Sequence, residues 1–212
     1  MTNFIPSTYE VETRFCFLCP DEVWDVLPMF QSYIHQEVEW HTIHYGQALF
    51  EADQILRINH TLRQGKSSSS LGWKEPDQGR SVNIRIEIEE AITQGIHNSN
   101  ILTRLGCDKT FNTPAALAAE LISLGHPKFM EFSGRNLTGD YEPQEFHLKL
   151  MLASDPSLGY PLLFEIEKTA HSPEQAWEFE KEITEFVRDH RLEERVVREE
   201  PPMLLYRALH LG

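Results

Sequence analysis

Charged residues alternate with apolar residues in several short segments of this chain, and this alternation constrains the fold more than any other feature of the sequence. The first segment is YEVETRF, residues 9–15, in which Glu10, Glu12 and Arg14 are two residues apart. Because side chains alternate between the two faces of a β-strand, this spacing puts two carboxylates and a guanidinium in one row on one face. An isolated segment of this kind would be typical of a surface strand with a solvated outer face.

The same alternation recurs in QILRINHTLRQ (54–64), SVNIRIEIEEAI (81–92), FHLKLML (146–152) and LLFEIEK (162–168). The polar positions of these segments are Arg57 and Asn59, then Arg85, Glu87 and Glu89, then His147 and Lys149, then Glu165 and Glu167. LGWKEPD adds Lys74 just before a Pro-Asp turn. The low-complexity segment GKSSSS, residues 65–70, indicates a flexible hairpin loop. This recurrence argues against an isolated surface strand.

Three segments have the pattern of amphipathic helices. NTPAALAAELISLGH (112–126) begins with a Thr-Pro pair and has Gly125 as its stop signal. SPEQAWEFEKEITEFVRDH (172–190) begins with a Ser-Pro pair and has an acidic outer face. A shorter helix is expected from about Asp21.

These helices need an apolar surface to pack on, and the apolar faces of the strands provide it. If helices cover those faces, the charged faces must look toward one another. Unpaired ions in a dry core would cost several kcal/mol or more each, which a wet lumen avoids. The sequence therefore predicts an α+β fold whose strands close into a barrel with a polar lumen. An open antiparallel sheet with a solvated polar face is the alternative.

The composition bounds the partners of the chain. Its net charge of −14 disfavours binding to nucleic acid or to anionic membranes, because those partners require a basic surface. The sequence has no run of about eighteen apolar residues and no signal-peptide pattern at its start. We expect a single cytoplasmic domain over residues 1–212, as a monomer or homodimer, with the four tryptophans packed between strands and helices.

The charged faces carry a specific chemistry. The acids come in pairs, and paired carboxylates repel each other unless a divalent cation or basic side chains neutralise them. Hard oxygen ligands suit Mg²⁺ or Mn²⁺. Most of the bases are guanidinium groups, which match phosphate oxygens in a bidentate fork. The chain has no GxxxxGK[ST] loop, so any phosphate must be bound by side chains.

At this point the chain resembles the CYTH superfamily, the triphosphate tunnel metalloenzymes, which includes thiamine triphosphatases, inorganic tripolyphosphatases and class IV adenylate cyclases. EVETRF is similar to the ExExK signature of that family, with Arg14 in place of the usual lysine. The resemblance continues in the expected order through ILRINHTLRQGKSSSSLGWKEPD, RIEIEEAI, FSGRNL, LGYPLLFEIEK and MLLYRAL.

The resemblance implies an eight-stranded antiparallel β-barrel that forms a tunnel, with helices outside, and a small-molecule triphosphate as substrate. It implies Mg²⁺ or Mn²⁺ as cofactor, bound by Glu10, Glu12, Glu165 and Glu167. The implied phosphate ligands are Arg14, Arg57, Lys74, Arg85 and Arg135. The candidate catalytic carboxylates are Glu10, Glu12, Glu87 and Glu89, of which the last two would aid metal binding or orient the bases.

The chain departs from the family pattern at four positions. Asn59 stands where a second arginine is expected, Ser133 where a lysine is expected, and Ala153 where an acid is expected. Arg14 matters most, because a lysine can lose its proton to activate water and an arginine effectively cannot. A lumen glutamate or a metal-bound hydroxide would have to take that role.

Two classes of function remain open at this stage. The first is a metal-dependent triphosphatase acting on tripolyphosphate or on an organic triphosphate such as thiamine triphosphate. The second is a non-catalytic binder of polyphosphate or nucleotide on the same barrel. A class IV adenylate cyclase is a third alternative, although nothing in the sequence identifies a nucleoside pocket.

Overall fold

The computed structural model describes residues 8–92, 95–96, 98–152 and 162–211 of the protein. Its strands are β1 (Thr8–Phe17), β2 (Gln36–Tyr45), β3 (Ile55–Arg63), β4 (Lys66–Lys74), β5 (Asn83–Ala91), β6 (Lys128–Tyr141), β7 (Phe146–Leu152), β8 (Leu162–Ala170) and β9 (Val196–Val197). Its α-helices are α1 (Pro20–Val26), α2 (Gln47–Glu51), α3 (Asn100–Arg104), α4 (Pro114–Ser123), α5 (Pro173–Asp189) and α6 (Pro201–Leu211).

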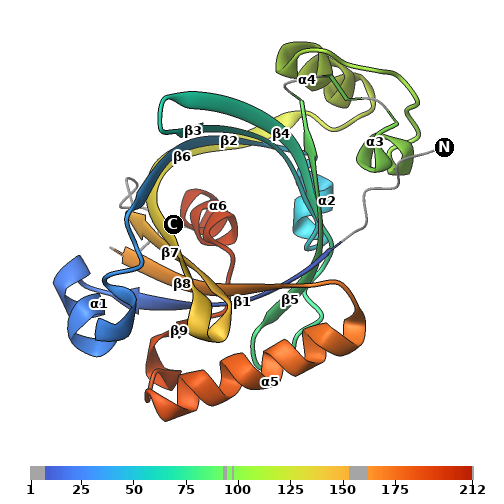
Figure 1. Ribbon diagram of the computed structural model, residues 1–212. Helices are drawn as coiled ribbons and strands as arrows, with labels where there is room; N and C mark the ends of the chain where they lie inside the picture. The colour runs from blue at the N-terminus through green and yellow to red at the C-terminus, as the bar shows by residue number, and fades with distance from the viewer. Residues whose placement is uncertain (1–7, 93–94, 97, 153–161, 212) are drawn as a thin grey trace.

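The long strands form one closed antiparallel barrel. Their order is β5-β4-β3-β2-β6-β7-β8-β1, and the ring closes because β5 also pairs with the first half of β1. The short β9 pairs with the second half of β1 at Arg14 and Phe15. Figure 1 shows the ring of strands nearly end-on. The closed barrel confirms the predicted α+β fold, and the open-sheet alternative is wrong.

The alternation in the sequence decides which side chains enter the lumen. On β1, Val11 and Phe15 point outward and are completely buried in the hydrophobic core under the helices. Glu10, Glu12 and Arg14, at the positions between them, point into the barrel. Because a strand has a side-chain period of two, each strand gives one face to the core and one face to the lumen.

Two helical layers cover the outside of the barrel. The long helix α5 runs along β1 and β8, and its Ile183 and Phe186 belong to the core cluster that also contains Val11. Helices α3 and α4 cover the opposite side near β4 and β5, where Leu117 packs in a second cluster with Leu71. No helix in the described part of the chain is long and apolar enough to cross a membrane.

The predicted helices are confirmed, including their first turns. The hydroxyl of Thr113 accepts a hydrogen bond from the backbone N–H of Ala116 at the start of α4. The hydroxyl of Ser172 accepts one from Gln175 at the start of α5. Each hydroxyl satisfies one of the backbone donors that the first helical turn leaves without a partner.

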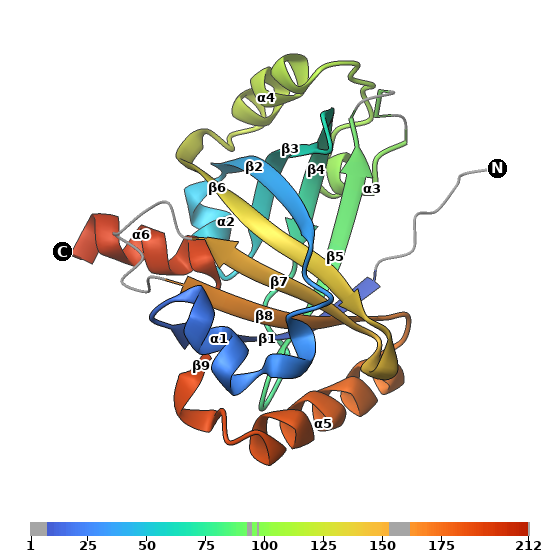
Figure 2. The same cartoon turned by 60° about the vertical axis from the view of Figure 1, so that its left-hand side comes forward.

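Helix α6 packs across one end of the barrel. Its Leu205 is buried against Phe50 of α2, Ile55 at the start of β3 and Met130 near the start of β6. Figure 1 projects α6 inside the ring of strands, whereas Figure 2 shows that α6 lies at one end of the barrel and that its C-terminus points away from it. Strand β3 begins beside α6, and the β3–β4 hairpin lies at the other end of β3. The hairpin therefore marks the opposite end of the barrel, which we call the hairpin mouth.

A hairpin is present where the sequence predicted one, but the flexible loop expected over residues 65–70 is wrong. The turn of the hairpin consists of Gln64 and Gly65 alone, with φ of 50° and 74°, and Arg63 pairs directly with Lys66. Positive φ at both central residues is the geometry of the tight two-residue hairpin turn. The serines that follow lie in β4 and complete the ladder with β3, so pairing overrides their weak strand propensity.

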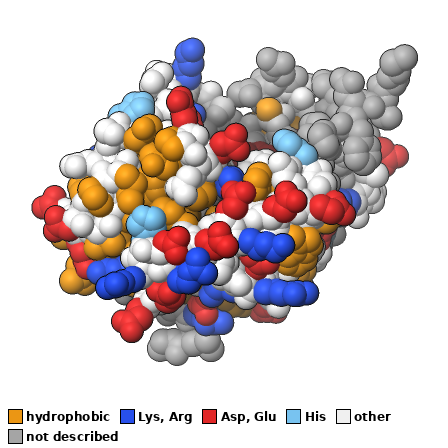
Figure 3. All heavy atoms as spheres, turned by 60° about the horizontal axis from the view of Figure 1, so that its bottom comes forward, with side chains coloured by type: hydrophobic (Ala, Val, Ile, Leu, Met, Phe, Trp, Pro, Cys, Tyr) orange, Lys and Arg blue, Asp and Glu red, His pale blue; other side chains and the backbone are white. Residues whose placement is uncertain are grey.

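The outer surface does not concentrate positive charge on the face seen in Figure 3. Acidic and basic side chains lie side by side there, with no broad basic patch. In addition to these surface residues, the basic side chains of Arg14, Lys74 and Arg85 are buried in the interior of the protein.

Candidate functional site

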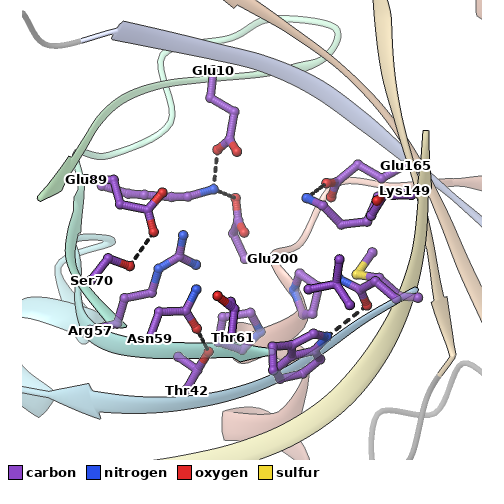
Figure 4. A pocket seen from close by; sticks show the side chains of 18 of the residues that line it. Glu10, Thr42, Arg57, Asn59, Thr61, Ser70, Glu89, Lys149, Glu165 and Glu200 are labelled. Carbon is purple, nitrogen blue, oxygen red and sulfur yellow. Dashed lines mark hydrogen bonds and ion pairs between the residues drawn. The ribbon is translucent and has the colours of Figure 1, made fainter. Parts of the chain in front are cut away.

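The barrel encloses a cavity of about 570 Å³. Every strand from β1 to β8 contributes inward side chains to its wall, and the segment from Glu200 to Pro202 at the start of α6 contributes the rest. Figure 4 shows acidic and basic side chains converging from opposite walls of this cavity. The predicted lumen placement is confirmed for Glu10, Glu12, Arg14, Arg57, Lys74, Glu89 and Glu165, which all line the cavity.

Three carboxylates meet closely enough to share one cation. One ligand oxygen from each of Glu10, Glu12 and Glu167 lies within 4.8 Å of the others, and we call this group the carboxylate cluster. Burial, and then repulsion from Glu87, raises the pKa of Glu10; burial, and then repulsion from Glu10, raises the pKa of Glu167. Burial raises the pKa of Glu12 well above its usual value although Arg14 opposes the shift. At this cluster, burial and repulsion between carboxylates therefore outweigh the nearby basic side chains.

Glu165 does not join the carboxylate cluster as its neighbour Glu167 does. Its carboxylate is paired with Arg14 and with Lys149 of β7. Burial favours the neutral form of Glu165, but these two cations outweigh burial and lower its pKa to about 2. Glu165 is thus an anion that holds two basic side chains, and it does not belong to the carboxylate cluster.

Arg14 lies at the centre of the charged half of the lumen. Its guanidinium contacts three carboxylates, those of Glu12, Glu165 and Glu200, and its side chain is only 2% exposed. Burial opposes the charge of Arg14, but the three acids overcome it and raise its pKa well above the usual value. The residue that replaces the usual lysine of the family signature is therefore permanently charged.

The other basic side chains of the lumen each have an acidic partner. Lys74 pairs with Glu10, and Arg57 pairs with Glu87 at 2.8 Å. Lys149, whose role the sequence left open, pairs with Glu165 and also lies 3.6 Å from Glu167.

Arg85 faces inward but is not among the residues that line the cavity. Its guanidinium binds the carboxylate of Asp53 at 2.8 Å and the backbone carbonyls of Asp53 and Glu75, and it reaches Glu200 at 3.3 Å.

Glu200 is a functional candidate that the sequence did not reveal. Its carboxylate lies 3.1 Å from Arg14, 3.3 Å from Arg85 and 3.9 Å from Lys74, and its side chain is 4% exposed. We call these three bases the cation cluster. Burial raises the pKa of Glu200, but the cation cluster outweighs burial and holds that pKa well below its usual value. The only sequence signal is an acid directly before the Pro-Pro pair that begins α6.

The remaining predicted carboxylates lie farther toward the rim. Glu87 is occupied with Arg57, which supports the alternative that it orients a base. Glu89 is exposed and accepts a hydrogen bond of 2.5 Å from the hydroxyl of Ser70 (Figure 4). Neither residue belongs to the carboxylate cluster.

The predicted lumen placement of Arg135 is wrong. Its side chain is 54% exposed on the outer face of β6 and pairs with Glu37 of β2. The inward positions of β6 are Phe132, Asn136 and Thr138, so Arg135 is one residue out of register. A shift of one residue moves a side chain to the opposite face of the strand.

The other departures from the family pattern have different outcomes. Ser133 is on the exposed outer face of β6 with Arg135, so the lysine expected there would not have reached the lumen in this register. Asn59 does face the lumen, and its side-chain oxygen accepts a hydrogen bond from Thr42 of β2 (Figure 4). Ala153 lies outside the described residues.

The wall formed by β2 and β6 carries no charge near its centre. Its inward side chains include Trp40, Phe132 and His44, and His44 stacks on Phe132 with a centroid distance of 5.3 Å. Burial, and then the charge of Arg57, lowers the pKa of His44 to about 3, so this ring is neutral. The prediction that all tryptophans pack between strands and helices is wrong for Trp40, which lines the lumen.

Comparison with solved structures shows the same fold in several proteins. The PH1819 protein of Pyrococcus horikoshii OT3 superposes with a TM-score of 0.69 at 17% identity, over 93% of this chain and 98% of that one. A Vibrio parahaemolyticus protein described as "a putative adenylate cyclase" superposes with a TM-score of 0.61 at 13% identity, over 93% and 98% of the two chains. HpAC1 from Hippeastrum, described as an adenylyl cyclase candidate with a dominant triphosphatase activity, has a TM-score of 0.50 at 12% identity, over 87% and 88%. No family model and no curated protein sequence matches the chain.

Proposed function

We propose that this chain, which has the barrel fold implied by its resemblance to the CYTH superfamily, hydrolyses a triphosphate with the help of a divalent metal ion. The observation that carries the proposal is that buried basic side chains line one cavity together with Glu10 and Glu12, two of the three members of the carboxylate cluster. Basic side chains favour phosphate oxygens, and clustered carboxylates favour a divalent ion. Together they suit a metal-chelated polyphosphate.

The phosphate groups would be held by the basic side chains that line the cavity. The buried or half-buried ones are Arg14, Arg57, Lys74 and Lys149, which come from four different strands and point toward the same space, and the exposed Arg63 lines the cavity near the hairpin. Guanidinium groups can bind two phosphate oxygens at once, whereas the lysines act as point charges. Each of the four buried or half-buried cations is paired with a carboxylate in the free protein. The phosphate groups of a bound triphosphate would therefore replace carboxylates as the partners of these cations.

The carboxylate cluster fits Mg²⁺ or Mn²⁺. Its members offer hard oxygen ligands within 4.8 Å of one another, and burial together with repulsion from neighbouring carboxylates raises their pKa values, which a bound cation would offset. When bound there, the ion would neutralise phosphate charge and stabilise the charge that develops on the transferred phosphoryl group. The side chains of the protein would bind and orient the substrate.

Arg14 would bind phosphate and would not act as a base. Its pKa is raised even above that of a free guanidinium, so it cannot accept a proton. Glu165, with a pKa of about 2, is a weak base. The carboxylates of the cluster, whose pKa values are raised, are better suited to accept the proton of an attacking water.

The direct test measures phosphate release from tripolyphosphate, thiamine triphosphate and ATP, each with Mg²⁺ or Mn²⁺ and each with a chelator. We expect metal-dependent release from at least one of them. The triphosphatase activity described for HpAC1 supports this class of reaction. Formation of cyclic AMP from ATP would favour the cyclase alternative, to which the description of the Vibrio protein points.

A non-catalytic binder is the second candidate. It is favoured by the position of Arg14, where a permanently charged side chain replaces the lysine of the family signature and is held by three carboxylates. Binding of tripolyphosphate without release of phosphate, under every metal condition, would support this alternative and contradict hydrolysis.

The metal assignment is tested by replacing Glu10 and Glu12 with glutamine in one variant. We expect Mn²⁺ and Mg²⁺ binding to be lost in calorimetry, with the fold intact, because the change removes ligands and also relieves repulsion. The matched control replaces Glu37 and Glu39, which have the same spacing on the exposed outer face of β2. Unchanged metal affinity in the Glu10/Glu12 variant would show that the assignment is wrong.

A further inference from the structure

The uncharged wall of the lumen has features that a bare polyphosphate would not use. Val38, Trp40, Phe132 and Met151 all line the cavity, and the last three are only partly buried. Phosphate oxygens gain nothing from apolar side chains, whereas a flat organic ring gains contact area and stacking on an aromatic face.

The indole ring of Trp40 lies flat against the barrel because its neighbour on β6 has no side chain. Trp40 is directly opposite Gly134, and a Cβ atom added to Gly134 would lie 2.3 Å from Cζ2 of the indole. That distance is far shorter than any real contact, so the ring occupies the space that a side chain at Gly134 would fill. A glycine at this inward position therefore lets the indole cover the backbone of β6.

Two further contacts fix the orientation of this ring. The indole Nε1–H donates a hydrogen bond of 2.9 Å to the side-chain oxygen of Asn136, and Phe132 packs edge-on with a centroid distance of 5.4 Å and an angle of 86°. With its N–H satisfied and one face on the backbone, Trp40 still lines the cavity. A rigid aromatic surface is thus already in place before any ligand arrives.

The position of Trp40 along the barrel separates it from Arg57 and the cation cluster, whereas the exposed Arg63 of β3 also lines the cavity near the hairpin mouth. Trp40 pairs with Thr61 of β3, and Arg57 lies four residues earlier on the same strand, or about 13 Å away at 3.3 Å per residue. Thr61 lies close to the hairpin mouth, whereas Arg57 and the cation cluster lie toward the end that α6 covers. The neutral side chains of Asn59, Thr61 and Ser70 line the cavity between or beside these two regions.

We propose that the substrate is an organic triphosphate with a flat heterocyclic ring, and that Trp40 is the residue on which this ring packs. This inference rests on the proposed function and assigns it a substrate class. The triphosphate enters the charged end first, and the ring remains near the hairpin mouth against Trp40. Gly134 and Asn136 are positioning residues, because they act by holding the indole flat.

The test compares ligands that share the triphosphate and differ in the ring. Binding of ATP, thiamine triphosphate and tripolyphosphate is measured by calorimetry with Mg²⁺ for the wild type, for Trp40→Leu and for Gly134→Ala. We expect Trp40→Leu to weaken binding of the preferred organic triphosphate about 10- to 100-fold, the range that ring stacking supports. The affinity for tripolyphosphate should change less than about twofold, because phosphate does not contact the ring.

Gly134→Ala keeps the indole and displaces it from the wall, so it should show the same selective loss. The matched control is Trp177→Leu on α5, which removes a 36%-exposed tryptophan from the outer surface and should alter no affinity. If Gly134→Ala does not fold, the result for Trp40→Leu decides.

The outcomes distinguish this inference from the proposed function. If tripolyphosphate binds as tightly as both organic triphosphates, or if Trp40→Leu weakens all three equally, the inference is wrong and triphosphate binding by the barrel stands. If none of the three ligands binds to the wild type, both the inference and the proposed function fail.

Discussion

Replacing Glu200 with glutamine should increase the affinity of the lumen for tripolyphosphate. In the free protein, the Glu200 carboxylate lies 3.1 to 3.9 Å from all three bases of the cation cluster. A phosphate group that binds Arg14 and Lys74 must displace this carboxylate or share the space with it. Glutamine has nearly the same shape and no charge, so the substitution removes the competing anion with little change in packing.

The magnitude follows from the geometry and from the behaviour of buried ion pairs. Two unit charges 4 Å apart interact by about 4 kcal/mol at an effective dielectric constant of about 20, but desolvation of the ions cancels much of this gain. We therefore expect a net increase in tripolyphosphate affinity of about 10- to 100-fold, or about 1.4 to 2.8 kcal/mol. Without ligand, the variant should lose about 3 to 5 kcal/mol of free energy of unfolding, because the cation cluster loses its counterion.

The assay is a calorimetric titration with tripolyphosphate in the presence of a metal chelator, which isolates the contribution of the basic side chains. Thermal unfolding with and without tripolyphosphate measures the stability that the ligand restores. The matched control is Glu199→Gln, which makes the same charge change one residue away, where Glu199 pairs with Arg207 and is 35% exposed. An unchanged or lower affinity in Glu200→Gln would refute the idea that Glu200 competes with phosphate.

Three further predictions concern other residues of the lumen. Arg14→Lys keeps the charge but loses the planar guanidinium, so tripolyphosphate should bind about tenfold more weakly in a titration. The control, Arg135→Lys on the outer face, should have no effect. Equal affinity in the two variants would contradict the role of Arg14. His44 has a pKa of about 3 in place of its usual 6.5, so the unfolded chain gains a proton that the native protein lacks as pH falls below 6.5, and stability decreases. At pH 5 this loss in the free energy of unfolding is about 2 kcal/mol. Denaturant unfolding at pH 7.5 and pH 5 measures it, and His44→Phe should remove it. If the stability of the variant decreased between the two pH values as much as that of the wild type, the role of His44 would be contradicted. Because the pKa values of the carboxylate cluster are raised, protons compete with metal ions there, and the affinity for Mn²⁺ should rise from pH 5 to pH 7.5. A Mn²⁺ affinity that does not depend on pH would contradict the assignment of this cluster as the metal site.

The strand alternation allowed the barrel and much of its charged lumen to be predicted from the sequence. Residues such as Glu10, Glu12 and Arg14 share one face because the period of a strand is fixed, and local spacing is enough to group them. The same rule explains the error at Arg135. β6 runs without interruption from Lys128 to Tyr141, and its weak alternation allowed a one-residue error in register, which reverses every side chain.

The residues that the sequence missed reach the lumen through tertiary structure. Glu200 lies outside any alternating strand, and it enters the lumen because α6 packs across the end of the barrel. Trp40 lies in a strand with alternating polarity, but its role depends on the absence of a side chain at Gly134, which is 94 residues away in sequence and directly opposite in the barrel. No local pattern carries information of this kind.

The net charge of −14 does not prevent this chain from binding a polyanion, because the charge of the lumen is set locally. The raised pKa of Glu12 favours its neutral form, in which it does not repel phosphate, whereas the low pKa of Glu200 keeps that carboxylate charged and bound to the cation cluster. Glu200 therefore offsets the charge of the cation cluster in the free protein, and that charge becomes available to a phosphate group when Glu200 is displaced. It follows that the affinity for a triphosphate depends on how easily Glu200 leaves the cation cluster, and therefore also on the packing of α6, which positions Glu200.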